Sequence, residues 1–351
     1  MHSVVLKNDA VGDLVPALKA INNIISSSKK VTIFLSKLSE KWSFLVNNPK
    51  VEIKILNYDL NIIEKIKLIF FLTKNDIHNV YILAPKNFYF YLPIVFKKIK
   101  FYAICINNIN NYRRPSLLLR KFLFKYKIND REKIFKRDSI YSIQEKLTSV
   151  NNINFNFKFA VNVKKKDDLI KYLPKKYIYF QYKKKICDAL GWRLKELKIL
   201  FSEFCNYYEN VVFTRDIAGW DKLRGEKNNK ENNLTFEDSF NFYDFKLKKF
   251  IDKKSNVLLI DNIGGEDLFN VIKYSNKVVA WHGQMTSLGF ILKKNVLDLW
   301  YVNINTWEDY RKYRNAFYEF KPKNENYDFT IANRNVRKTI RKMKFSLERG
   351  V

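Results

Sequence analysis

The sequence predicts a two-domain α/β protein in which each domain holds a parallel sheet covered by helices. Its 351 residues fit two domains of the usual size, roughly 100–200 residues each. Hydrophobic residues make up 47% of the chain, which is enough for two packed cores. In both halves, short apolar runs alternate with longer amphipathic segments, a pattern typical of parallel sheets with helices on both faces.

The first half shows this alternation from its start. The helix expected at 13–25 has apolar residues at helical spacing and places Pro16 in its first turn, where a missing N–H costs little. Further helices are expected at 58–73 and 88–96. The expected strands are 4–6, 31–35, 51–56, 78–83 and 101–106.

The middle of the chain, about 112–175, is more basic and less regular. It predicts a helix at 116–127, mixed structure at 131–149 and a connection rich in Asn and Lys at 151–166. We therefore expect an N-terminal domain at 1–160 and a C-terminal domain at 161–330. A C-terminal helix at 331–351 is expected to pack back on the N-terminal domain.

The alternation resumes in the second half, interrupted by a polar loop at 220–235. Strands are expected at 177–181, 210–214, 257–260, 277–281 and 296–299. Helices are expected at 192–205, 236–251, 266–274, 286–293, 306–318 and 332–348. Two such runs predict two Rossmann-like domains facing each other, with ligands bound in the crevice at the carboxyl ends of the strands.

The chain is strongly basic, with 65 Lys and Arg against 35 Asp and Glu and a formal net charge of +30. This excess favours polyanionic partners: nucleic acid, an anionic membrane surface or phosphorylated substrates. A general bias toward Lys, Asn and Ile explains the charge equally well. The basic residues are dispersed along the chain and not gathered in one tail, so no nucleic-acid partner is expected.

Cysteine usage and the N-terminus indicate the compartment. The three cysteines form no CxxC pair, which argues against a disulfide framework and a zinc site. The N-terminus has no apolar signal core, and no stretch reaches the ~18 uncharged apolar residues of a membrane span. We expect a cytoplasmic protein, soluble or peripheral at the inner face of the plasma membrane, with no metal and no resident cofactor.

The first segment with candidate catalytic residues joins the first strand to the first helix. Gly12 is expected to allow a tight turn there, and Asp13 to lie at or near the helix N-cap. Its carboxylate either caps the helix, as Asp often does, or accepts a proton from a sugar hydroxyl.

Two further segments follow strands of the second half. Lys183, Lys184 and Lys185 lie just past a strand, where they either neutralise a diphosphate or form a solvated basic loop. Glu266 follows paired glycines at the start of a helix. Its carboxylate either interacts favourably with the helix dipole or holds a ribose.

The fourth segment is a buried strand that ends in His282-Gly283. The next helix begins with Gln284, Met285, Thr286 and Ser287, whose free N–H groups are suited to bind phosphate. A lone histidine is either structural or a ligand contact, and both interpretations remain open here. No GxxxxGK[ST], GxGxxG, HExxH or GxSxG occurs, which argues against P-loop NTPases, standard dinucleotide dehydrogenases, zincins and serine hydrolases.

Together these segments resemble the bacterial ADP-heptose:lipopolysaccharide heptosyltransferases, glycosyltransferase family nine of the GT-B superfamily. The resemblance lies in 4–7, Gly12-Asp13 and Pro16-Ala17-Leu18, in 178–192 ending at Trp192, in 265–268 with 274–279, and in 296–299. It implies a GT-B fold with an interdomain cleft, a nucleotide-sugar donor held by the C-terminal domain, inversion at the anomeric carbon and no essential metal. In the family the aspartate matching Asp13 is the proposed catalytic base.

The resemblance gives a specific functional expectation. Asp13 would deprotonate an acceptor hydroxyl, and the three lysines with the helix N-terminus at 283–286 would stabilise the leaving diphosphate. The acceptor would be a lipopolysaccharide or another surface glycan or glycolipid. His282-Gly283 departs from the family's Asp-[Ser/Thr]-Gly and is similar to other GT-B transferases, so a CMP- or UDP-sugar donor is the alternative. The second alternative is a non-enzymatic basic protein that binds nucleic acid or anionic surfaces.

One basic group is a candidate for the acceptor side. Four residues of the N-terminal half would either meet a phosphorylated lipid acceptor or remain solvated surface charge: Arg113, Arg114, Arg120 and Lys121.

Overall fold

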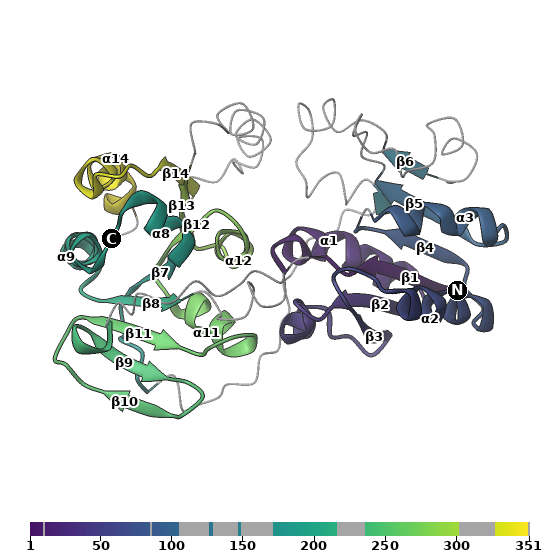
Figure 1. Ribbon diagram of the computed structural model, residues 1–351, viewed down its shortest axis with the longest axis horizontal. Helices are drawn as coiled ribbons and strands as arrows, with labels where there is room; N and C mark the ends of the chain where they lie inside the picture. The colour runs from purple at the N-terminus through teal and green to yellow at the C-terminus, as the bar shows by residue number, and fades with distance from the viewer. Residues whose placement is uncertain are drawn as a thin grey trace. The chain divides into compact units, whose positions relative to one another are not determined.

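The computed structural model describes residues 1–9, 11–84, 86–104, 126–128, 147–148, 171–215, 236–301 and 327–349. The chain forms two compact units, one holding the described residues up to 148 and the other those from 171 onward (Figure 1). The boundary expected near 160, the helix at 306–318, the loop at 220–235 and the basic group Arg113, Arg114, Arg120 and Lys121 lie outside the described residues.

The first unit contains a six-stranded sheet in the order β3-β2-β1-β4-β5-β6, and all its described strand pairs are parallel. This is the strand order of a Rossmann fold. The strands follow the apolar runs of the sequence: β1 (His2–Lys7), β2 (Lys30–Ser36), β3 (Val51–Leu56), β4 (Asn79–Ile82), β5 (Lys100–Ile104) and β6 (Tyr126–Ile128). Strand β6 overlaps the end of the helix that the sequence predicted at 116–127.

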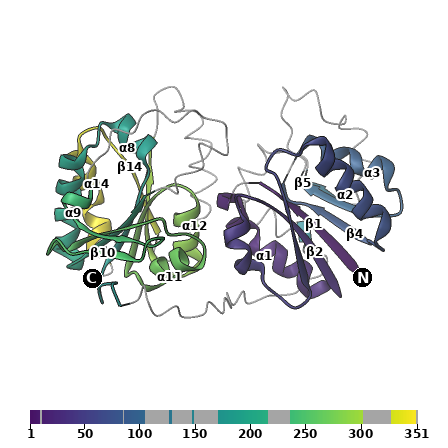
Figure 2. The same ribbon diagram turned by 60° about the horizontal axis from the view of Figure 1, so that its bottom comes forward.

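Helices cover both faces of this sheet (Figure 2). On one face lies α1 (Val11–Ser27). On the other lie α2 (Ile62–Lys74), the 3-10 helix η2 (Asn87–Tyr91) and α3 (Leu92–Val95), which share one apolar cluster with the sheet. A second 3-10 helix, η1 (Glu40–Val46), follows β2. The helix expected at 88–96 is thus divided between η2 and α3.

The second unit repeats the Rossmann strand order and adds a hairpin at one edge, giving β10-β9-β11-β8-β7-β12-β13-β14. Only the β9–β10 pair is antiparallel among its described pairs. Its strands are β7 (Ile178–Tyr182), β8 (Val211–Arg215), β9 (Asn241–Asp244), β10 (Lys249–Ile251), β11 (Val257–Asp261), β12 (Lys277–Trp281), β13 (Asn295–Trp300) and β14 (Tyr327–Ile331). The predicted α/β class with two Rossmann-like sheets is confirmed.

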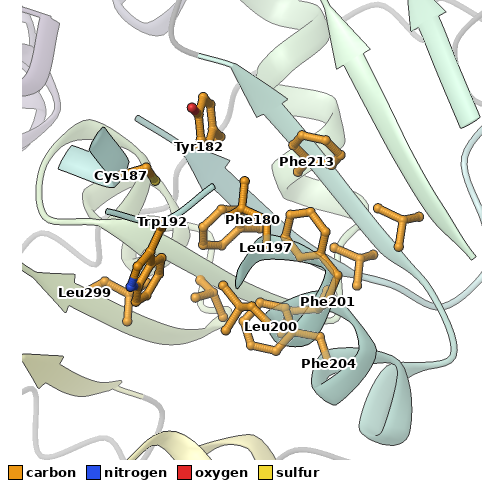
Figure 3. Packing of buried hydrophobic residues seen from close by; sticks show 14 of the residues in the cluster. Phe180, Tyr182, Cys187, Trp192, Leu197, Leu200, Phe201, Phe204, Phe213 and Leu299 are labelled. Carbon is orange, nitrogen blue, oxygen red and sulfur yellow. The ribbon is translucent and has the colours of Figure 1, made fainter. Parts of the chain in front are cut away.

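The helices of the second unit enclose an aromatic-rich core (Figure 3). Phe201 of α9 packs edge-on against Phe180 of β7, with ring centroids 5.4 Å apart, and lies 4.9 Å from the ring of Phe213. Aromatic rings bury large apolar areas, so this cluster stabilises the contact between helix and sheet. The α-helices are α8 (Lys184–Leu190), α9 (Leu194–Tyr208), α11 (Glu266–Tyr274), α12 (Gln284–Ile291) and α14 (Val336–Glu348).

The last helix, α14, belongs to the second unit, so the expectation that it packs on the N-terminal domain was wrong. Met343 and Leu347 are fully buried in the same cluster as the residues of α9. The indole Nε1 of Trp192, just before α9, donates to the carbonyl of Asn333 at 3.0 Å, which ties the segment before α14 to the same place. The apolar face of α14 completes this core, and that burial determines its position.

The prediction of a helix at 236–251 was also wrong. A single 3-10 turn, η3 (Phe236–Asp238), is followed by the β9–β10 hairpin. The Asp244 carboxylate accepts the N–H groups of Lys246 and Leu247 at 2.8 and 2.9 Å, and Lys248 adopts a φ of 53°. This side-chain turn reverses the chain where the apolar spacing alone suggested a helix.

Within the part of the chain that the structure describes, no helix is both long enough and apolar enough to cross a membrane.

Candidate functional site

The proposed base, Asp13, is the third residue of α1 and is half-buried. It follows the carboxyl end of β1, the edge of a parallel sheet at which ligands bind. Gly12 is the second residue of the helix and has no positive φ, unlike Gly191, Gly265 and Gly283. The expected role of Gly12 as a turn residue was therefore wrong.

A buried ion pair lies next to Asp13. Lys7 ends β1 with its side chain 1% exposed, and its Nζ contacts Oδ2 of Asp9 at 2.7 Å. Burial raises the pKa of Asp9, the Lys7 ammonium opposes this shift, and the nearby Asp13 carboxylate adds to it. Oδ1 of Asp9 is buried without a hydrogen-bond partner among the described residues. Sequence reasoning missed this pair, although a lysine within a buried apolar strand was the available signal.

Hydrogen bonds from neighbouring elements fix the residues between β1 and α1. The Ser36 hydroxyl donates to the carbonyl of Asp9 at 2.6 Å. The Tyr89 hydroxyl donates to Oδ1 of Asn8 at 2.6 Å, and Nδ2 of Asn8 donates to the carbonyl of Asn57 at 2.9 Å. Groups at the end of β2, after β3 and in η2 thus hold Asn8 and Asp9 in place.

In the second unit, His282 follows the carboxyl end of β12. Its Nδ1 lies 2.8 Å from Oδ2 of Asp298, and its ring stacks on the indole of Trp300, with centroids 3.9 Å apart and planes 19° apart. A carboxylate can only accept, so Nδ1 carries the hydrogen. Nε2 is then the acceptor of the neutral ring, or a second donor when the ring is protonated.

Asp298, in β13, is the centre of this arrangement and was not identified from the sequence. Its side chain is 1% exposed. Besides His282, its Oδ2 accepts from Nε1 of Trp300 at 2.9 Å and from the hydroxyl of Tyr327 in β14 at 2.6 Å. This carboxylate is held by three donors and in turn keeps the imidazole in one orientation.

Lys183 and Gly283 meet beside His282. Nζ of Lys183 donates to the carbonyl of His282 at 3.3 Å. Gly283 has a φ of 145°, and a Cβ at this position would lie 3.5 Å from that ammonium. The backbone at the start of α12 therefore approaches a positive charge closely. The N–H groups of a first helical turn lack partners within the helix, so ammonium and amides together suit an anion.

The remaining residues predicted at this segment have different roles. The hydroxyl of Thr286 donates to the carbonyl of Gly283 at 2.7 Å and accepts its N–H at 3.1 Å, so it caps α12. Met285 is 5% exposed and belongs to the interior. The N–H of Ser287 donates to the carbonyl of Gly283 at 3.1 Å. Nε2 of Gln284 is buried and unpaired among the described residues, which makes Gln284 an additional donor for a ligand.

Lys184 and Lys185 are separated from this place. Both lie in the first turn of α8, and both are exposed, so the expectation of a three-lysine loop was wrong. Nζ of Lys184 pairs with Oδ2 of Asp188 one turn further along at 2.5 Å. Of the three lysines, only Lys183 contacts the His282–Gly283 backbone in a described interaction.

Glu266 begins α11, after Gly265 with a φ of 60°. The preceding strand β11 lies three positions from β12 in the sheet, which is about 14 Å at ~4.8 Å for each step. Glu266 is therefore a candidate contact for the far end of an extended ligand whose anionic part lies at α12. Among the described residues, no group of three or more His, Cys, Asp and Glu side chains is placed to hold a metal ion.

No family model matches the sequence, and no curated protein sequence matches it significantly. Solved structures do match along the whole chain. Heptosyltransferase WaaC of E. coli, solved with ADP-2-deoxy-2-fluoro heptose, is similar over 100% of both chains, with a TM-score of 0.56 and 11% identity. The E. coli ADP-heptose lps heptosyltransferase II is similar over 99% of this chain and 98% of its own, at a TM-score of 0.60 and 10% identity.

A solved structure with a different enzymatic activity is similar as well. A UDP-GlcNAc 2-epimerase from Methanocaldococcus jannaschii has a TM-score of 0.56 at 14% identity, over 99% of this chain and 93% of its own. The GT-B fold expected from the resemblance to heptosyltransferases is thus confirmed. At these identities the likeness concerns the fold, so the chemistry must be argued from the site residues.

Proposed function

We propose that this chain is a glycosyltransferase that moves a sugar from a nucleotide-sugar donor to a lipopolysaccharide or another surface glycan. The observation that carries the proposal is the meeting of Lys183, the His282 ring and the start of α12 at the carboxyl end of β12. An ammonium, an oriented imidazole and the amides of a helix N-terminus match the charge of a diphosphate. The heptosyltransferase fold supports this assignment.

The donor would lie along the carboxyl edge of the second sheet. Lys183 and the first amides of α12 would bind the diphosphate, and His282, fixed by Asp298, would donate from Nε2 to a phosphoryl oxygen when its ring is protonated. Glu266 would contact the ribose. The positive charges that neutralise the leaving group then come from the protein itself, which supports a reaction without an essential metal.

The transfer would be a direct displacement. Asp13 takes the proton of an acceptor hydroxyl, and the hydroxyl oxygen attacks the anomeric carbon from the side opposite the diphosphate. The bond between that carbon and the diphosphate oxygen breaks, and its electron pair leaves with the nucleotide. The new bond forms on the opposite face, so the configuration inverts.

The donor is the open part of the proposal. ADP-heptose is the donor expected from the resemblance, while His282-Gly283 favours a CMP- or UDP-linked sugar. A panel of ADP-, UDP- and CMP-sugars separates these alternatives, since a ligand that binds only the folded state raises the melting temperature. Release of the free nucleotide in the presence of a glycan acceptor identifies turnover.

Two adjacent lysines provide the test of the site. We expect Lys183→Ala to weaken binding of the stabilising nucleotide sugar about tenfold or more, because a charge-assisted contact worth about 1.5–3 kcal/mol is lost. Lys184→Ala, which removes an exposed charge of the same kind, should change the dissociation constant less than about twofold. Isothermal titration measures both. Equal effects of the two variants, or no stabilisation by any nucleotide sugar, would overturn the proposal.

A further inference from the structure

We propose that the outward faces of α2 and α3 form a docking surface for an anionic phospholipid membrane. Four apolar side chains of α2 are exposed to solvent: Ile62 by 74%, Ile63 by 64%, Phe70 by 58% and Ile66 by 47%. Single exposed apolar residues are normal, but several on one helix form a patch, and such patches mark interaction sites.

The exposed side chains of α2 share one side of the helix. Ile62, Ile66 and Phe70 follow one another at intervals of four residues, so they form a continuous stripe. Leu68 and Leu72 lie on the opposite side and are buried in the core of the first unit. The helix is thus held to the sheet by its inner face, and the outer apolar stripe remains exposed.

A second exposed apolar group lies on the same face of the sheet. Tyr91, Ile94 and Val95, in η2 and α3, are exposed by 42%, 46% and 66%. The inner side chains of α2, η2 and α3 pack in one cluster, and Nζ of Lys65 lies 5.7 Å from the centre of the Phe88 ring, which links α2 to η2. Figure 2 shows α2 and α3 on the side of the sheet opposite α1. The two exposed groups therefore lie on neighbouring helices of the same face of the sheet.

Lysines surround this surface. Lys67 and Lys74 lie on α2 beside the apolar stripe, and Lys97 and Lys98 follow α3; all four are exposed. A basic residue near an anionic membrane contributes about 1 kcal/mol of attraction, and apolar side chains add to it when they enter the interface. An apolar centre with a lysine border complements the surface of an anionic phospholipid membrane.

The charge also distinguishes this occupant from a second copy of the chain. Two copies joined through this face would bring their lysine borders together, in a chain with a formal net charge of +30. Three acidic residues lie near α2: Glu64 is engaged in the capping box with Asn61, the exposed Asp59 precedes the helix, and Asp76 lies beyond its end. An anionic partner offsets this excess, and a copy of the chain increases it.

Vesicle binding tests the surface without any reference to the transfer reaction. Wild-type protein should co-sediment with vesicles of phosphatidylcholine and phosphatidylglycerol far more than with phosphatidylcholine alone, and salt should weaken the binding. We expect Ile63→Ser with Phe70→Ser to lower the partition coefficient about tenfold or more. Lys67→Gln with Lys74→Gln should lower it in the anionic vesicles only.

Matched controls come from exposed residues of the second unit. Leu247 and Phe345 are 68% and 64% exposed, and Lys338 and Lys342 are exposed on α14. Leu247→Ser with Phe345→Ser, and Lys338→Gln with Lys342→Gln, should leave the partition coefficient within about twofold. Unchanged melting temperatures exclude misfolding of the variants.

Three outcomes would overturn the inference. They are equal loss of binding in the α2 variants and the controls, no preference for anionic vesicles, and a dimer in sedimentation analysis that Ile63→Ser with Phe70→Ser dissociates. If the vesicle test fails, the proposal of donor binding at Lys183 still stands. If donor binding at Lys183 fails, the vesicle test still stands.

Discussion

The two sheets share one strand order, but their carboxyl edges carry different charged residues. In the first unit this edge carries the Lys7–Asp9 pair beside the carboxylate of Asp13. In the second it carries Lys183, the His282 ring and the start of α12. The strand order determines where side chains collect, but the residues just past the strands determine what they bind. The first edge is suited to accept a proton and the second to hold an anion.

The largest expected effect separates these two roles. Asp13→Asn should lower kcat at least about 100-fold, because a general base contributes roughly 100- to 10,000-fold. The dissociation constant of the nucleotide sugar should stay within about twofold, since Asp13 lies in the other unit from the proposed phosphate site. Single-turnover kinetics and calorimetry measure the two quantities. A kcat within about threefold of wild type would remove Asp13 as the base.

A second test concerns the carboxylate that holds the His282 ring. Asp298→Asn removes a buried anion with three donors, and we expect the melting temperature to fall by about 5–10 °C. Tyr327→Phe removes one donor only and should lower it by about 2–4 °C. The nitrogen NMR shifts of His282 should report a changed tautomer in the first variant and not in the second. Identical spectra for wild type and Asp298→Asn would contradict the orienting role.

A third test depends on pH and concerns a lysine at the opposite end of β12. Nζ of Lys277 donates to the carbonyls of Ser346 and Arg349, next to the end of α14. Burial lowers the pKa of Lys277 to about 8. The unfolded chain keeps the ordinary value near 10.5, so between pH 8 and 10.5 it binds more protons than the folded state. Stability from this group therefore rises with pH through that window.

Lys277→Met should abolish this rise. Between pH 7.5 and 10 the wild type should gain about 2–3 kcal/mol of unfolding free energy relative to the variant. Lys273→Met changes an exposed residue in the last turn of α11, so its unfolding free energy should depend on pH as that of the wild type does. Urea unfolding at several pH values gives the three curves. Parallel curves for Lys277→Met and wild type would show that Lys277 titrates normally in the folded state.

Much of the fold could be predicted from the sequence, because most of its strands are buried runs and its longer helices have one apolar face. The β9–β10 hairpin was the main error. Phe242 and Tyr243 fit a helical pattern as well as a strand, and the turn depends on a single side chain, Asp244. The position of α14 was wrong for a different reason: an apolar face shows that a helix packs, but not on which core.

The site could be predicted only in part. Lys183, His282 and Gly283 come directly after strands, so their place at the carboxyl edge followed from the strand assignments. Asp298 and Tyr327 lie within strands. Asp298 reaches His282 because β13 lies beside β12, and Tyr327 reaches Asp298 because β14 lies beside β13. Sheet neighbours distant in sequence leave no local pattern, so the residues that orient the imidazole were beyond sequence reasoning.

The late arrival of β14 and α14 has a consequence for synthesis. The six strands of the first sheet are complete by residue 128, whereas the core of the second unit includes Met343 and Leu347. Chains fold from the N-terminus as they leave the ribosome, at about 5–20 residues per second. The first sheet can therefore assemble on the growing polypeptide, whereas the core of the second unit is complete only after the much later synthesis of β14 and α14.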